Sequence, residues 1–74
     1  MKILNKKAVN ELRKFYPAGA TVELIRMDDP QAPAPGTRGI ISHIDDAGSI
    51  HVSWETGSTL ALIPGEDQFR IIQI

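Results

Sequence analysis

The stretch Gly39–Ile63, GIISHIDDAGSIHVSWETGSTLALI, decides the fold, because it joins three β-type segments through two tight turns. Residues 39–44, 50–54 and 59–63 are rich in β-branched and aromatic side chains, which favour strands. Gly48 and Gly57 each stand third in a three-residue loop, the position that takes a left-handed backbone in a bulged hairpin. The stretch therefore predicts three consecutive antiparallel strands.

The same loops predict which residues face each other across the strands. The first loop places Ile44 opposite Ile50, and the second places Val52 opposite Leu60 and Ile50 opposite Leu62. Both registers bring one apolar set to the inner face: Ile40, Ile44, Ile50, Val52, Trp54, Leu60 and Leu62.

Two further segments, Thr21–Met27 and Phe69–Ile74, have the same strand character. Before them, Asn5–Phe15 has apolar residues at helical spacing, and the Asn5 side chain can cap the first turn. The expected apolar face of this helix consists of Ala8, Val9, Leu12, Phe15 and Tyr16. We therefore expect a single domain over residues 1–74, mainly β and α+β by content. An amphipathic helix over residues 5–15 precedes a small five-stranded SH3-like antiparallel barrel over residues 20–74.

Length and composition narrow the class of protein. The 74 residues suffice for one small domain, and the absence of cysteine excludes disulfides and Cys-based metal sites. No apolar run approaches the about 18 residues that a membrane span needs, and the apolar N-terminal stretch is too short for a signal peptide. A cytoplasmic protein without membrane contact is the expectation.

The formal net charge of -1 hides an asymmetry along the chain. Met1–Lys14 contains five Lys or Arg and one Glu, a charge of +4, whereas the remainder contains three Arg and eight acidic residues, a charge of -5. Either the basic helix lies against the acidic body of its own monomer, or one of the two parts meets a charged partner.

Five motifs carry a family resemblance: YPAG at 16–19, VELIRMDDP at 22–30, PGTRG at 35–39, DDAGSI at 45–50 and WETGS at 54–58. With them the chain resembles, over nearly its whole length, a bacterial and phage family of short domains of unknown function that is common on mobile elements. The family implies no activity. A second likeness, which covers Val52, Trp54, Glu55 and Gly57 and the Gly-Thr-x-Gly motif before them, is to SH3-like modules of mind-bomb-type ubiquitin ligases, which bind peptides.

We predict a non-catalytic protein-interaction module of a phage or mobile-element type. Its surface combines the proline-rich loop at 27–38 with the turns at 45–49 and 55–58. The partner is a protein or peptide segment, a basic one if the acidic body recognises it. Trp54 has the parity of a core residue, but its ring edge can also serve as a platform at the rim. The candidate binding residues are Met27, Asp28, Asp29, Arg38, Trp54, Glu55 and Thr56.

Catalytic and metal chemistry have little support in the sequence. The predicted register places His43 opposite His51, but no third ligand is evident, so two exposed polar residues and no metal are expected. There is no Gly-rich phosphate loop, no nucleophile elbow and no recognisable Ser–His arrangement. We therefore expect neither enzyme activity nor a cofactor.

Two other functions stay open. A counter-defence protein would inhibit a host factor or sequester a small nucleotide, with Arg26, Arg38 and Arg70 as candidate cations. Nucleic-acid binding would need the basic helix as its docking element, and the acidic body argues against it. The small core also favours a homo-oligomer as a possible assembly, since the helix can cover a neighbouring chain as readily as its own barrel.

Overall fold

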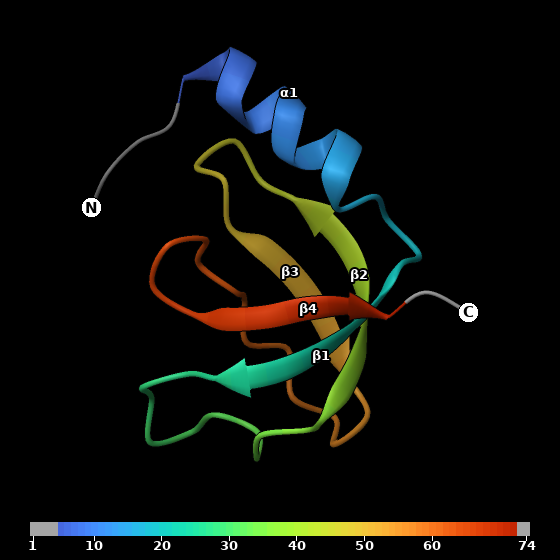
Figure 1. The fold of residues 1–74 in the computed structure, drawn as a ribbon, viewed down its shortest axis with the longest axis vertical. Coiled ribbons are helices and arrows are strands. Elements are labelled where there is room, and N and C mark those ends of the chain that lie inside the picture. The colour runs from blue at the N-terminus through green and yellow to red at the C-terminus, as the bar shows by residue number, and fades with distance from the viewer. Residues whose placement is uncertain (1–4, 73–74) are drawn as a thin grey trace.

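The computed structural model describes residues 5–72, which form one helix and a four-stranded antiparallel sheet (Figure 1). The helix is α1 (Lys6–Phe15), and the strands are β1 (Thr21–Arg26), β2 (Arg38–Ile44), β3 (Ile50–Trp54) and β4 (Gln68–Ile72). Their order in the sheet is β3-β2-β1-β4. The end of the predicted strand at 73–74, and residues 1–4 of the basic segment, lie outside the described residues. Within the described part of the chain, no helix is long and apolar enough to cross a membrane.

Helix α1 begins as the sequence predicts. The Asn5 side chain accepts a hydrogen bond from the Ala8 N–H at 2.8 Å, which satisfies one of the free donors of the first turn. Val9 is the buried residue of this helix. Phe15 was expected on the apolar face, but it is 68% exposed. The helix contacts the sheet at β2, and Leu12 and Tyr16 of the expected apolar face are half-buried and pack against the core.

The hairpin of β2 and β3 confirms the predicted pairing. Ile44 lies opposite Ile50 and His43 opposite His51. Gly48 has a positive φ of 88°, the left-handed conformation that the three-residue loop requires.

One residue of the predicted inner face lies on the other side of the sheet. Ile40 is 47% exposed, and its neighbour Ile41, which is 1% exposed, is in the core instead. The reason is a β-bulge between Ile41 and His43, where Ser42 is an extra residue on β2. A bulge reverses the alternation of side chains on one side of it, so the parity counted back from Ile44 is wrong at Ile40.

The predicted strand at 59–63 does not form. In this segment an isolated β-bridge joins Leu62 to Ile50. The backbone groups of Leu60, two residues earlier, form hydrogen bonds with side chains instead. The Leu60 carbonyl accepts the Trp54 indole N–H at 2.9 Å, and the Leu60 N–H donates to Ser58 Oγ at 3.3 Å. These groups are therefore not available to a ladder with β3, and the sheet has four strands rather than the five expected for a barrel.

The core fills the inner face of the sheet. Gly39 of β2 is buried and lies opposite Trp54 of β3, and a Cβ at this position would come within 2.5 Å of Val52 Cγ1 and 2.9 Å of Trp54 Cε3. Only glycine therefore lets β2 approach these side chains so closely. The buried apolar residues are Val9, Val22, Leu24, Ile41, Ile44, Ile50, Val52, Trp54 and Leu62.

Candidate functional site

The three segments predicted to form one binding surface lie at two ends of the sheet. The loop at 27–37 leads into β2 and the turn at 55–58 follows β3, and these ends meet where Gly39 pairs with Trp54. The turn at 45–49 lies at the opposite end of the same hairpin, beneath α1 (Figure 1). A single surface can therefore combine the first two segments but not all three.

The long loop is held against β1 by backbone hydrogen bonds. The Gly36 N–H donates to the Leu24 carbonyl at 2.7 Å, and the Leu24 N–H donates to the Thr37 carbonyl at 2.8 Å. Thr37 is buried, and its hydroxyl donates to the Ala34 carbonyl at 2.6 Å. Pro33 is buried as well. The loop therefore has a fixed path next to β1 and β2.

The two predicted apolar anchors differ in how far they are buried. Trp54 is buried in the core, with its indole N–H on the Leu60 carbonyl. Met27 is half-buried and packs against the core. The structure therefore gives Trp54 the core role of the two that the sequence left open.

The predicted polar residues divide into turn-forming and surface groups. Asp29 Oδ1 accepts the Gln31 N–H at 2.8 Å, which closes a turn, and Asp28 pairs with Arg26 at 3.5 Å. Both aspartates are exposed, as is Thr56 at the tip of its turn.

Glu55 fastens the end of β3 to the start of β2. Its carboxylate accepts the Arg38 N–H at 3.1 Å, while its own N–H donates to the Arg38 carbonyl at 2.9 Å. This pairing holds the Arg38 and Glu55 side chains at the same edge of the outer face.

The outer face of the sheet carries a charged row that the sequence did not reveal. Glu23 of β1 lies opposite Arg38 of β2 and opposite Arg70 of β4. Its carboxylate meets Arg38 Nε at 3.5 Å and Arg70 Nη2 at 2.9 Å. The sequence shows that these three residues are charged. It does not show that they lie side by side, because this depends on the pairing of β1 with both β2 and β4.

A shallow groove of about 200 Å³ lies beside this row. Ile40 stands exposed in its wall, and Ile25, at a bulge of β1, is a second exposed isoleucine of the sheet. The groove is lined by Thr21, Arg38, Gly39, Ile40, Ser53 and Glu55. It thus combines an apolar wall with hydroxyls and with one charge of each sign. Of the residues predicted for binding, Arg38 and Glu55 lie in it.

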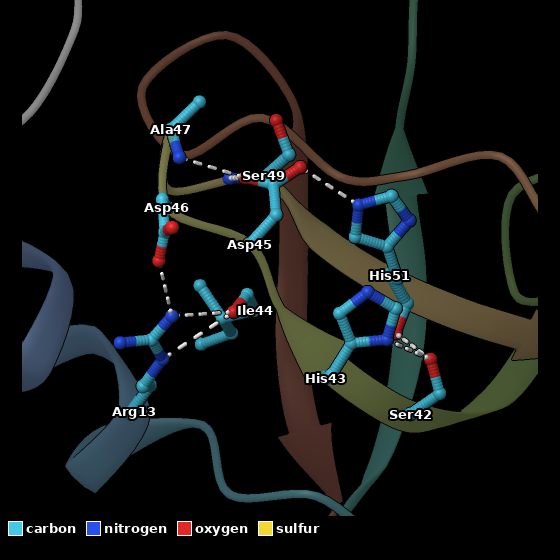
Figure 2. Close-up of polar contacts among 9 residues, drawn as sticks. All are labelled: Arg13, Ser42, His43, Ile44, Asp45, Asp46, Ala47, Ser49 and His51. Carbon is cyan, nitrogen blue, oxygen red and sulfur yellow. Dashed lines mark hydrogen bonds and ion pairs between the residues drawn. The ribbon is translucent and has the colours of Figure 1, made fainter.

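The other end of the hairpin holds two imidazoles and a carboxylate (Figure 2). The rings of His43 and His51 are stacked, with centroids 4.4 Å apart and an angle of 5° between their planes. Asp45 accepts the His51 Nε2–H at 2.8 Å and the N–H groups of Ala47 and Ser49, each at 3.0 Å. The hydrogen bond from His51 and those from the turn hold the pKa of Asp45 below its ordinary value.

This cluster stabilises the turn and does not form a catalytic triad. Ser42 Oγ contacts His43 Nδ1 at 3.0 Å, whereas Asp45 contacts His51, so the serine and the carboxylate act on different imidazoles. No group of three His, Cys, Asp or Glu side chains within residues 5–72 is placed to hold a metal ion.

Arg13 joins the helix to the same turn (Figure 2). Its Nη2 donates to the Ile44 carbonyl at 2.9 Å and meets Asp46 Oδ1 at 3.2 Å. A pocket of about 270 Å³ beside this contact is lined by Lys6, Val9, Arg13 and Asp46. The basic helix therefore does lie against an acidic group of its own monomer, through one of its cations.

The chain is thus a small α+β domain with a shallow groove on the outer face of its sheet, lined by both apolar and polar residues. A family model described as a domain of unknown function (DUF4314) matches residues 5–72. The chain belongs to this family. No curated protein and no solved structure matches it.

Proposed function

We propose that the protein is a non-catalytic interaction module that binds an extended segment of another protein on the outer face of its sheet. The observation that carries this proposal is Ile40, a large apolar side chain that stands exposed next to the groove. An extended segment laid on the sheet would cover Ile40 and fill the groove. Burying apolar area of this kind stabilises a complex.

The charges at the groove favour a protein segment over a phosphate ligand. A nucleotide would need Arg26, Arg38 and Arg70 to act together, but Arg26 pairs with Asp28 away from the other two. Glu23 also lies between Arg38 and Arg70, so the three side chains together carry a net charge of +1, which matches one carboxylate better than a phosphate group with about two negative charges. The counter-defence alternative fits the same surface if the bound segment belongs to a host protein of a phage or mobile element.

We propose further that the domain is related to SH3-like modules. What supports this is the order of a long loop after the first strand, a β2–β3 hairpin, a connector that bridges back to β3 at Leu62, and a final strand. SH3 domains bind extended Pro-rich segments of other proteins in a groove on their surface. Here the loop at 27–37 and the turn at 55–58 adjoin the groove.

Selection from a phage-displayed random peptide library tests the proposal. Selected peptides are then measured for binding to the wild type and to two variants, Ile40→Ser on the outer face and Phe15→Ser on α1. Both variants remove an exposed apolar side chain, but only Ile40 lies at the groove, so Phe15→Ser is the matched control. We expect Ile40→Ser to weaken binding by about tenfold or more and Phe15→Ser to leave it unchanged. Circular dichroism confirms that both variants are folded.

The proposal fails if the selection yields no binder, or if the selected peptides bind Ile40→Ser as tightly as the wild type.

A further inference from the structure

We propose that the bound segment carries an apolar residue and, two positions later, an acidic residue on the side that faces the sheet. The acidic side chain then lies over Arg38 and Arg70. This inference rests on the proposed function and adds the chemistry of the partner. It reverses the basic partner expected from total charge, because the charges exposed at the centre of the outer face differ from those of the whole body.

The outer face consists of rows that cross the strands. In one row, Thr21 of β1 lies between Ile40 of β2 and Ile72 of β4. Two residues further along β1, the next row places Glu23 between Arg38 and Arg70. Successive rows on one face of a sheet are about 6.6–6.8 Å apart, twice the rise of a strand residue.

The charge that the second row shows to solvent is positive. The side chain of Glu23 is 18% exposed, whereas those of Arg38 and Arg70 are 56% and 62% exposed. Each guanidinium has five N–H donors, and Glu23 occupies Nε of Arg38 and Nε and Nη2 of Arg70. Within residues 5–72 the remaining side-chain donors of both arginines have no hydrogen-bond partner, so they can meet an approaching carboxylate.

The neighbouring charges leave this preference in place. The Glu55 carboxylate already accepts the Arg38 N–H, at the margin of the groove. Asp28 is paired with Arg26, beyond the end of the row. Neither carboxylate competes for the free guanidinium donors among the contacts that the described residues make.

The row spacing matches the side-chain spacing of an extended peptide. Residues i and i+2 of such a peptide project on one side, also about 6.6–6.8 Å apart. An apolar residue at i over Ile40 therefore brings residue i+2 over the arginines. Asp or Glu at i+2 gains charge-assisted hydrogen bonds there, and Lys is repelled.

Three synthetic peptides that differ at one position test the inference. They are Ile-Thr-Glu-Thr-Ile, Ile-Thr-Gln-Thr-Ile and Ile-Thr-Lys-Thr-Ile, each acetylated and amidated so that the termini carry no charge. Dissociation constants are measured by NMR titration of the ¹⁵N-labelled protein at low salt. We expect the Glu peptide to bind about fivefold tighter than the Gln peptide, and the Lys peptide to bind weakest.

Two variants locate the preference. Arg70→Gln should reduce the ratio between the Glu and Gln peptides, because one of the two recognising cations is lost. Glu23→Gln should increase that ratio, because both guanidiniums lose their shared carboxylate. The opposite shifts of these two variants exclude a general effect of weakened folding, which would move both in one direction.

The inference is overturned if the three peptides bind with equal affinity, if the Lys peptide binds tightest, or if no peptide binds. The library selection separates this from failure of the proposed function. Selected peptides that depend on Ile40 but carry no acidic residue would contradict the inference alone. A selection that yields no peptide dependent on Ile40 would contradict the proposed function as well.

Discussion

The two faces of the same sheet differ sharply in what their side chains do. On the inner face, Val22, Leu24, Ile41 and Val52 are buried in one continuous core. On the outer face, the residues between them form an apolar row and a charged row, with Ile40 exposed at a groove. Burial of the inner side chains therefore holds the sheet together, and the exposed outer side chains are those that we propose to bind a partner.

The largest expected effect separates two neighbouring isoleucines. Ile41→Ala should reduce the free energy of unfolding by about 2–5 kcal/mol, because it opens a cavity in a packed core. Ile40→Ala removes an exposed side chain and should cost less than about 1 kcal/mol. Urea denaturation followed by circular dichroism measures both. Equal losses would break the distinction between the faces.

That pair of residues also marks what the sequence can and cannot predict. Gly48 predicts the register of the β2–β3 hairpin because its loop has a required geometry, and Asn5 predicts the start of α1 for the same local reason. Gly57 has the expected positive φ, but of the two pairings predicted from its loop only that of Ile50 with Leu62 forms among the described residues. The bulge at Ser42 contains no glycine or proline that would indicate it in the sequence. The alternation of residues therefore predicts Ile40 on the inner face of the sheet, which is wrong.

The candidate site was less predictable than the fold. Arg38 and Glu55 were chosen from their turns, and both lie at the groove. The sequence does not single out Glu23, and it offers Arg70 only as a cation for a nucleotide, because both residues meet Arg38 through pairings of β1 that long connections leave open. Leu60 shows the same limit, since its backbone bonds to the side chains of Trp54 and Ser58, which the pattern of apolar residues does not predict.

A smaller effect concerns the helix that closes one end of the inner face. Arg13→Ala should cost about 1–2 kcal/mol, because the Ile44 carbonyl loses its charged donors from the helix and Asp46 loses its partner. Lys14→Ala is the matched control, because it removes an adjacent cation for which the described residues show no ion pair. Its effect should be within about 0.5 kcal/mol. Thermal unfolding compares the two, and a larger loss for Lys14→Ala would contradict the docking role of Arg13.

The smallest effect is a dependence on pH at the turn to which the helix is fastened. The pKa of Asp45 is lowered in the folded protein from its ordinary value of 3.8, chiefly by the hydrogen bond from His51. The Asp45 carboxylate therefore stabilises the fold when the pH is above this ordinary value. This contribution is lost as the pH falls below about 4. The stability of Asp45→Asn should therefore fall below that of the wild type at pH 7, and the two should converge in acid. Parallel curves between pH 6 and pH 2 would show that Asp45 makes no such contribution.

The position at which a peptide binds tests the division between the faces most directly. In an NMR titration of the ¹⁵N-labelled wild type with acetyl-Ile-Thr-Glu-Thr-Ile-amide, we predict the largest amide shifts at Thr21, Glu23, Arg38, Ile40 and Arg70. We predict small shifts in α1 and in the turn at 45–49. Largest shifts in either of those two segments would contradict the assignment of the outer face as the binding surface.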